Sequence, residues 1–210
     1  MFHEMSIYTT VSGQLPAFTQ SFREKTLVLR LQFGGRFKGA WTSEFGLLNT
    51  LVVLWEFDDL IQRETTTVLI ESSEEWTAHS RALTPSLASV ETLLLRPHRQ
   101  INRRPDDGRM YDFRIYDIKP FHAQTYAKHL AGVLPVREKH SKNFCVWTPA
   151  AGNMNRVVHL WPYEDPDQRL DVRVSVAAEP EWQVFVSKVF PLIVHQRSSM
   201  LRPVMNLYQG

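Results

Sequence analysis

Five side chains in the second half of the sequence could do chemistry together. They are Arg114, Tyr116, His159, Trp161 and Tyr163. Two of them alternate along residues 111–118 and three along residues 155–163, and both segments mix apolar and polar residues as β-strands do. Alternate residues of a strand point to the same face of a sheet. If both segments belong to one sheet, the five share a face and combine a fixed charge, an imidazole and aromatic walls, as small-molecule pockets do.

Two of these residues could take part in a reaction. His159 carries an imidazole, which usually titrates near neutral pH and could act as a general acid or base. Arg114 could hold a carboxylate or an enolate. This pair would suit a monooxygenase or an isomerase that works without a cofactor, and a haem-binding variant is a weaker alternative. The opposing interpretation is that both side chains are hydrogen-bonded lining of a filled core, so the sequence leaves open whether the protein is an enzyme.

Other reactive residue types are scattered and indicate no stronger site. His122 and His129 lie seven residues apart without a cysteine or a second histidine close to either, which is weak evidence for a metal site. Cys145 lies within an apolar segment and is expected to be a buried, unreactive thiol. The sequence contains neither a glycine-rich phosphate loop nor a nucleophile elbow. We therefore predict no metal and no cofactor.

The stretch that carries the candidate imidazole is repeated earlier in the chain. NRVVHLWPYEDPDQR at 155–169 echoes NTLVVLWEFDDLIQR at 49–63, an offset of 106 residues. Trp-Thr, Glu-Trp and Leu-Arg-Pro recur at the same offset. Such a long ungapped register predicts duplication of a unit of about 100 residues, the size of a small domain. We predict a first domain at 1–97, a linker at 98–109 and a second domain at 110–210.

Each unit has the same predicted order of elements, β-α-β-β-α-α-β, which is that of a ferredoxin-like α+β domain with a divided second helix. The predicted helices include 14–32 and 76–89 in the first unit and 180–196 in the second. The third strand of each unit is apolar on both faces, so something must cover the face that the helices leave free. We predict that the two sheets face each other and form an α/β barrel with the helices outside.

Strand periodicity also predicts which side chains line the barrel. The smaller apolar residues of the third strands are predicted to contact the helices, and these are Val52, Leu54, Val158 and Leu160. Trp55 and Trp161 then face the barrel, together with the rest of the candidate site. A shift of one residue would exchange the two faces.

The two copies differ at the candidate site. The matching positions of the first copy are Ser6, Tyr8, Val53, Trp55 and Phe57. The first copy therefore lacks both the arginine and the histidine. We predict that a polar pocket lies only in the second half and that the first half mainly closes the barrel.

Two acid–arginine pairs recur in both copies and are expected to be structural. They are Asp59 with Arg63 and Asp165 with Arg169. The spacing in each pair predicts a helix cap and an i,i+4 ion pair.

The composition is that of an ordinary globular protein. Of the 210 residues, 43% are hydrophobic and 22% charged, and the net charge is +2. The basic run at 98–109 is interrupted by acids, Pro105 and Gly108, which indicates a solvated linker rather than a nucleic-acid surface. The one cysteine excludes an internal disulfide and suits a reducing compartment. We see neither a signal peptide nor an apolar run long enough to span a bilayer, and therefore expect a cytoplasmic protein.

At these residues the sequence resembles the NIPSNAP family. The resemblance lies in LPVREKHSKNFCVWT (134–148), VVHLWPYEDPDQR (157–169), PEWQVFVSKVFPLI (180–193) and LRP (201–203). It covers 111–204 well and 2–97 more weakly. It implies a dimeric α/β-barrel fold, often with the unit in tandem, and no settled enzymatic activity, while small monooxygenases and haem-handling proteins share only the barrel. We therefore interpret the protein as a NIPSNAP-like barrel of undetermined biochemical function that binds a small organic ligand or serves as an interaction module, and that could form a homo-oligomer.

The difference between the copies generates a first prediction. His159→Val should leave the protein folded, because Val53 already occupies the matching site of the first copy. It should weaken the binding of a small acidic or aromatic ligand, because it removes a polar group from the predicted pocket. A thermal-shift ligand screen on wild type and variant measures this, and ligands that stabilise both proteins equally would contradict it.

Overall fold

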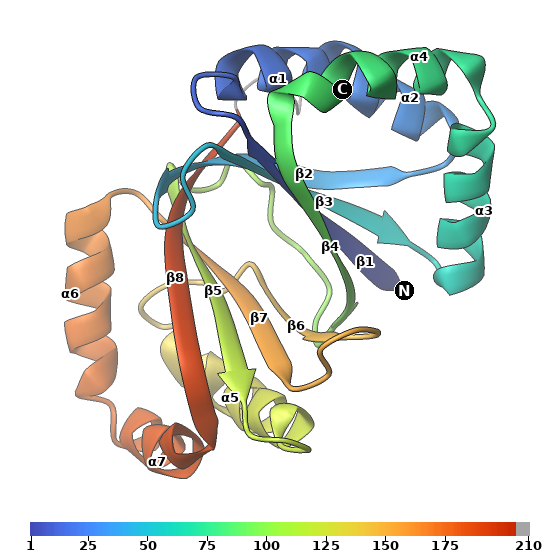
Figure 1. Ribbon diagram of the computed structural model, residues 1–210. Coiled ribbons are helices and arrows are strands. Elements are labelled where there is room, and N and C mark those ends of the chain that lie inside the picture. The colour runs from blue at the N-terminus through green and yellow to red at the C-terminus, as the bar shows by residue number, and fades with distance from the viewer. Residues whose placement is uncertain (205–210) are drawn as a thin grey trace.

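The molecule is organised around a closed barrel of eight strands, built from two similar halves (Figure 1). The computed structural model describes residues 1–204. The first half contributes β1 (Phe2–Thr10), β2 (Arg36–Phe45), β3 (Thr50–Phe57) and β4 (Leu87–Pro97). The second half contributes β5 (Met110–Ile118), β6 (Cys145–Pro149), β7 (Arg156–Tyr163) and β8 (Ile193–Pro203).

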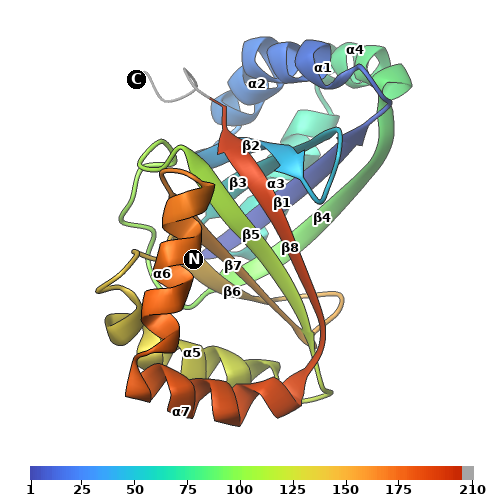
Figure 2. The ribbon, with the colours of Figure 1, turned by 90° about the vertical axis from the view of Figure 1, so that its left-hand side faces the viewer.

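Helices cover the outer face of each half (Figure 2). In the first half they are α1 (Leu15–Ser21), the π-helical turn η1 (Phe22–Thr26), α2 (Leu27–Gln32), α3 (Leu60–Glu71), α4 (Glu74–Leu83) and the 3₁₀ turn η2 (Thr84–Ser86). In the second half they are α5 (Ala123–Arg137), α6 (Pro166–Ala177), α7 (Pro180–Val189) and the 3₁₀ turn η3 (Phe190–Leu192). The first set lies above the barrel in Figure 1 and the second set lies beside and below it.

The strand order confirms the predicted architecture. Neighbouring strands run in the order β1-β3-β2-β8-β5-β7-β6-β4 around the barrel. Within each half this is the ferredoxin-like order, with the first and third strands central. Two antiparallel pairings, β2 with β8 and β4 with β6, join the halves and close the barrel. The predicted division at 98–109 falls between β4 and β5, and its meaning as a domain boundary stays a prediction.

The two faces of the sheet are the reverse of the prediction. The smaller residues of the third strands, Val52, Leu54, Val158 and Leu160, pack inside the barrel. Trp55 and Trp161 pack against the helices of their own halves, so the predicted site also lies on the helix side. The rest of the barrel core includes Met5, Ile7, Trp41, Leu95, Tyr111, Phe113, Ile115, Phe144, Cys145, Trp147 and Leu201.

The reversal has a physical reason. Period-2 alternation shows that two sets of side chains oppose each other, but it assigns a face only when one face is polar. Both faces of β3 and β7 are buried here. An eight-stranded barrel has an interior just wide enough for side chains. Trp41 and Trp147, from β2 and β6, already fill much of it, so the central strands present medium-sized residues there.

Three predicted helices are shorter or less regular than expected. The helices predicted at 76–89 and 180–196 end at Leu83 and Val189, and each is followed by a 3₁₀ turn that contains a proline. Proline lacks an N–H group and cannot continue the helical hydrogen bonds. The helix predicted at 14–32 is interrupted by the π turn η1.

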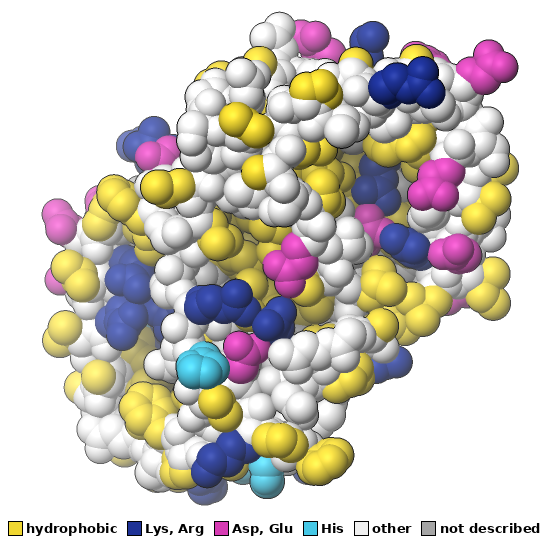
Figure 3. All heavy atoms as spheres, in the orientation of Figure 1, with side chains coloured by type: hydrophobic (Ala, Val, Ile, Leu, Met, Phe, Trp, Pro, Cys, Tyr) yellow, Lys and Arg dark blue, Asp and Glu magenta, His cyan; other side chains and the backbone are white. Residues whose placement is uncertain are grey.

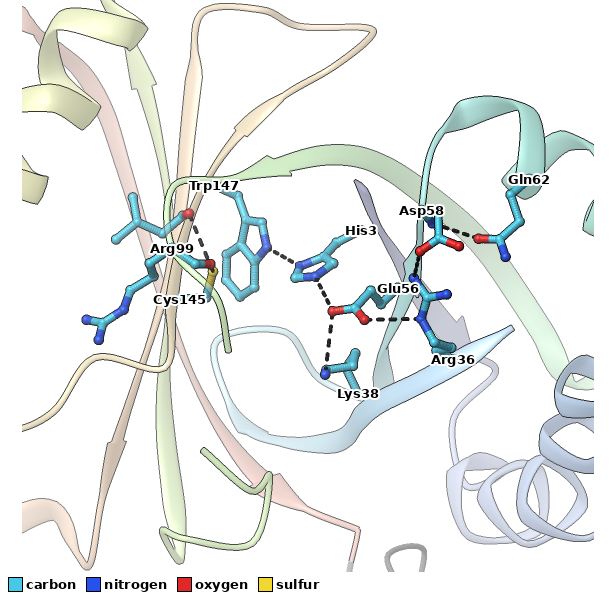
Figure 4. Close-up of polar contacts among 10 residues, drawn as sticks. His3, Arg36, Lys38, Glu56, Asp58, Gln62, Arg99, Cys145 and Trp147 are labelled. Carbon is cyan, nitrogen blue, oxygen red and sulfur yellow. Dashed lines mark hydrogen bonds and ion pairs between the residues drawn. The ribbon is translucent and has the colours of Figure 1, made fainter. Parts of the chain in front are cut away.

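A buried hydrogen-bonded chain connects the halves at one end of the barrel (Figure 4). Trp147 of β6 donates from Nε1 to His3 Nδ1 at 2.7 Å, and His3 Nε2 lies 3.3 Å from Glu56 Oε2. Because Nδ1 accepts, the proton of the neutral ring is on Nε2 and is donated to Glu56. Glu56 also pairs with Arg36 and Lys38 at the barrel rim. Burial lowers the pKa of His3 to about 4, against the opposing effect of Glu56.

This chain predicts acid sensitivity. Unfolded His3 gains a proton near pH 6.5, whereas the folded protein resists protonation until about pH 4. Neutral His3 therefore makes its full contribution to the free energy of unfolding above pH 6.5. This contribution, about 3 kcal/mol, is lost as the pH falls towards 4. His3→Gln keeps a neutral acceptor and donor, so urea unfolding of this variant between pH 7.5 and 4 should show a flatter pH dependence than wild type. Parallel curves would contradict the assignment.

Candidate functional site

The residues of the predicted site do lie together, between the sheet and the helices of the second half. Arg114 donates from Nη1 to the Tyr116 hydroxyl at 3.0 Å. The rings of Tyr116 and His159 meet edge to face with centroids 4.8 Å apart. Trp161 donates from Nε1 to His159 Nδ1 at 2.6 Å. Whether this cluster binds a ligand stays a prediction.

His159 is neutral and enclosed. It is 3% exposed, and because Nδ1 accepts from Trp161 the ring proton is on Nε2. Nε2 has no hydrogen-bond partner among the described residues. Burial, and after it the positive charge of Arg114, lowers the pKa of His159 to about 3. The imidazole therefore does not titrate near neutral pH, where the sequence placed its acid–base chemistry.

Tyr163 is the fifth residue of the predicted site and bonds to an arginine from α5. Arg137 donates from Nη2 to the Tyr163 hydroxyl at 2.7 Å. The same guanidinium lies over the Trp161 ring, 4.4 Å from its centroid, which is a cation–π contact. The first half repeats this contact, with Arg30 of α2 lying 4.7 Å from the centroid of Trp55.

A fully buried carboxylate anchors the second-half cluster. Asp112 of β5 accepts from Arg114 Nε and Nη2 at 3.0 and 2.7 Å, and from Arg169 Nε at 2.7 Å. The Ser198 hydroxyl donates to its other oxygen at 2.6 Å. Burial alone would raise the pKa of Asp112, but these groups, led by Arg114, hold the pKa well below its usual range. Asp112 is therefore a charged structural partner.

The first half also has a buried carboxylate with two arginine partners, Glu4 of β1. Arg30 donates from Nη2 to Glu4 Oε1 at 2.7 Å, and Arg63 donates from Nε to Glu4 Oε2 at 2.7 Å. The Ser6 hydroxyl lies 3.4 Å from Oε1. Burial would raise the pKa of Glu4, but the two arginines outweigh burial and lower it.

These contacts correct the ion pair that was predicted in each half. Asp59 and Asp165 do cap α3 and α6, each accepting from the backbone N–H three residues later. Arg63 and Arg169, however, bind the carboxylates of the first strands rather than the caps four residues before them. A fixed, desolvated carboxylate is a stronger partner than a cap on an exposed helix end.

A pocket of about 350 Å³ opens beside this cluster in the first half. Its floor is the helix-facing side of β1 and β4, and its walls come from α1, η1, α2, α3, α4 and η2. Figure 3 shows a hollow between the upper helices and the sheet, with hydrophobic, basic and acidic side chains inside it. The lining residues are Glu4, Ser6, Tyr8, Phe18, Thr26, Arg30, Arg63, Thr67, Ile70, Glu71, Trp76, Ser80, Leu83, Thr84, Leu87, Val90 and Thr92.

One substitution between the halves explains much of the difference between the open space on the first sheet and the filled space at the matching place on the second. The pocket floor carries Ser6, whereas the matching strand position of β5 carries Arg114. Arg114 folds back onto Asp112 and reaches the Tyr116 hydroxyl, so its long side chain covers the corresponding part of the second sheet. The pocket therefore lies in the half that was predicted only to close the barrel.

Arg30 is incompletely bonded at the pocket wall. It is 8% exposed and lines the pocket, and its Nε has no hydrogen-bond partner among the described residues. The matching Arg137 bonds to the Tyr163 hydroxyl, but the first half has Phe57 at that position. Without that hydroxyl, Arg30 donates from Nη2 to Glu4 instead, and its Nε is left without a described partner. Buried donors without a partner are costly and mark sites that another group could complete.

The π turn η1 places a second polar group at the pocket. Thr26 ends the turn, lines the pocket and lies 2.8 Å from His79 Nε2 of α4. Burial, and then the charge of Lys25, lowers the pKa of His79, so the imidazole is neutral. Single π turns are common at functional sites.

Glu4 and Arg30 were not singled out from the sequence, and Ser6 was noted only as the counterpart of Arg114. A signal for them existed, because Arg63 and Arg169 recur at a constant offset and each needs an acid on a first strand. The acid is Glu4 in one copy and Asp112 in the other, which hid the correspondence. Arg30 lies in a helix whose length differs between the copies, so no fixed offset finds it.

Other site types have no support in the described part of the chain. Residues 1–204 contain no group of three or more histidine, cysteine or acidic side chains that could hold a metal ion. No helix in this range is long and apolar enough to cross a membrane. Cys145 is buried in the barrel, and burial raises the pKa of its thiol far above the usual value.

Comparisons with known proteins agree with the duplicated architecture. The NIPSNAP family model matches residues 3–100 and again residues 111–206. The chain is similar to a protein NipSnap homolog of Dictyostelium discoideum, with 24% identity over 96% of this chain and 87% of that protein. It is similar to human protein NipSnap homolog 3B, with 24% identity over 96% and 83%. The chain is also similar to a solved Fusobacterium nucleatum protein described as a candidate monooxygenase, with a TM-score of 0.69 over 97% of this chain and 92% of that protein. The sequence identity is 12%, so this similarity shows the fold alone.

The buried carboxylates predict a large and local stability effect. Asp112→Asn removes the charge that compensates Arg114 and Arg169, so the free energy of unfolding should fall by about 3 kcal/mol. Asp171→Asn, on the exposed face of α6, is the control and should change it by less than about 0.5 kcal/mol. Urea unfolding measures both variants, and equal effects would mean that the buried pairs contribute nothing specific.

Proposed function

This chain belongs to the NIPSNAP family, and we propose that it binds a small organic ligand in the pocket of its first half. The observation that carries the proposal is the open, helix-covered pocket of about 350 Å³ with a buried, incompletely bonded arginine at its wall. Pockets for small molecules usually measure about 300–1,000 Å³ and combine apolar walls with a few polar groups. Phe18, Ile70 and Leu83 provide apolar wall, and Arg30 and Thr26 provide polar groups.

The barrel interior is a poor alternative location. Large side chains, among them Trp41, Trp147 and Phe113, are fully or almost fully buried there and pack against one another. The second-half cluster around His159 is one alternative, because its Nε2 is also without a described partner, and a cleft of about 570 Å³ between α5 and α7 is another. The first-half pocket and the second half are far enough apart in sequence and structure for separate variants to distinguish them.

An enzymatic function has less support than binding. A monooxygenase or isomerase with His159 as base would need an imidazole that accepts a proton near neutral pH, and burial works against this. The likeness to a candidate monooxygenase rests on the fold, and fold does not determine function. We therefore infer a binding protein first.

The proposal also includes the compartment of the protein and its assembly into a homo-oligomer. Cys145 is a buried free thiol and the one cysteine of the sequence, which supports a reducing, cytoplasmic environment. A homo-oligomer is supported by the turn before α5, where Phe121 is 96% exposed beside the β6–β7 hairpin that carries Met154. Larger contiguous apolar patches mark contacts between subunits, so this turn and hairpin are where we place the contact.

Matched variants test the location of the site. Val90→Trp places a bulky ring at the open rim of the first-half pocket and should reduce ligand-induced thermal shifts by more than half. Gln196→Trp is the control, because Gln196 pairs with Tyr116 as Val90 pairs with Tyr8. A thermal-shift screen of a metabolite-sized library, repeated on wild type and both variants, measures the effect.

Two further variants sharpen the result. Ser6→Arg copies the second half, since Arg114 stands at the matching position and pairs with an acid two residues earlier, and it should abolish the shifts. His159→Val, which the sequence alone predicts to weaken binding, should instead leave them unchanged if the first-half pocket is the site. Hits that survive Val90→Trp and Ser6→Arg but vanish in His159→Val would move the site to the second half, and a screen without hits would refute the binding function.

A further inference from the structure

The charges around the first-half pocket select a class of ligand. Resting on the proposed binding function, we propose that the ligand is an organic monocarboxylate with an apolar body, and that Arg30 binds its carboxylate. The inference comes from the balance of charge at the pocket floor, from the second half as an internal reference, and from the chemistry of the pocket walls.

The acidic partners at the pocket floor are unevenly shared between two arginines. Arg30 and Arg63 share the single carboxylate of Glu4, whose two oxygens each accept from one arginine at 2.7 Å. The three groups together carry one net positive charge. Arg63 extends towards the solvent, where Glu64 pairs with it. Arg30 remains buried at the pocket wall and has Glu4, shared with Arg63, as its described acidic partner, so its guanidinium is the less fully balanced of the two.

The second half shows what completes such a guanidinium. Arg137 stacks on Trp161 as Arg30 stacks on Trp55. Arg137 has two described acceptors, the Tyr163 hydroxyl at 2.7 Å and the Ser141 carbonyl at 3.4 Å. Both are oxygen atoms, and both are supplied by the protein itself. An oxygen acceptor from a ligand would give Arg30 the bonding that Arg137 already has.

The acidic residues near the pocket do not oppose an anion strongly. Glu4 is fully engaged by the arginines, and their interactions lower its pKa, so its charge is neutralised locally. Glu71 also lines the pocket, but it lies exposed at the end of α3, where water screens it. A carboxylate bound deep at Arg30 therefore meets a favourable local field, whereas a dianion would exceed the single compensating charge.

The walls define the rest of the ligand. Around the polar floor the pocket is lined by Phe18, Ile70, Leu83 and Leu87, and Thr67 and Ser80 also line it. Apolar area gains affinity through burial, at about 25 cal/mol per Å². A compact alkyl or phenylalkyl group suits these walls better than a sugar or a second charge. A charge-assisted hydrogen bond to Arg30 would then fix the orientation of the ligand.

Acids and their amides test this inference directly. The probes are straight-chain acids from butanoate to octanoate and phenylacetate to 4-phenylbutanoate, each paired with its primary amide, in titration calorimetry at pH 7.5. The best acid should bind wild type about tenfold to a hundredfold more tightly than its amide, because a hydrogen bond to a charged group is much stronger than one to a neutral group. Raising the salt concentration from 50 to 500 mM should weaken the acid but not the amide.

Variants at Arg30 identify the group responsible. Arg30→Met should remove the preference for the acid, and Arg30→Lys should retain part of it. Arg23→Met is the control, since Arg23 is exposed on the neighbouring π turn and should leave the preference intact. Circular dichroism checks folding, and if Arg30→Met does not fold, Arg30→Lys and the wild-type acid-to-amide ratio decide.

The outcomes separate this inference from the binding function. If acids and amides bind equally well, or if neutral library compounds bind while no acid does, the carboxylate assignment is overturned and the pocket remains a binding site. If the acids bind but Arg30→Met keeps the full preference, Arg30 is not the anchor and the assignment is also overturned. If the probes and the whole library fail to bind wild type, the binding function falls first.

Discussion

Closure of the barrel is the constraint on which the rest of this molecule depends. The β2–β8 and β4–β6 ladders bring all eight strands into one sheet, so their inward side chains converge on a narrow axis. That interior becomes a shared core for both halves. Any space for a ligand must then lie on the outer face, between each half-sheet and its own helices, where the packing of a few helices decides how much room remains.

A buried acid on the first strand organises that outer face in both halves. Glu4 and Asp112 each receive an arginine from the helix after the third strand, which ties that helix to the sheet. They differ in their second partner. Asp112 is satisfied by a neighbour on its own strand, Arg114, whereas Glu4, one methylene longer, reaches Arg30 on a helix. One carboxylate shared by two arginines therefore gives a covered surface in the second half and a wall of a pocket in the first.

The sequence predicts the fold well because the fold depends on repeated, local signals. Alternating segments, two acid caps at Asp59 and Asp165, and a constant offset between copies were enough for two ferredoxin-like units in a barrel. The faces could not be assigned in the same way, since Trp55 and Val52 lie on opposite sides of a strand that is buried on both. The predicted cluster around Arg114 and His159 exists, but its enclosure depends on packing against helices, which residue types alone do not reveal.

The pocket was missed for a related reason. It depends on two positions where the first half lacks a polar group of the second half: Ser6 stands in place of an arginine and Phe57 in place of a tyrosine. A search for reactive side chains passes over such positions. Arg30 was also hidden by a change in helix length. The ring of Phe18 contacts Tyr8 as the ring of Tyr126 contacts Tyr116, yet Phe18 and Arg30 are one residue farther apart in the sequence than Tyr126 and Arg137.

The π turn absorbs that extra residue. In a regular α-helix one inserted residue rotates everything after it by about 100° around the axis, because each turn holds 3.6 residues. Such a rotation would turn Arg30 away from Trp55 and Glu4. A wide turn at Phe22–Thr26 takes up the insertion locally, so Phe18 before it and Arg30 after it both keep their angular positions. The first half thus holds one more residue between these two positions without losing the phase of either end, and Thr26, the last residue of the π turn, lines the pocket.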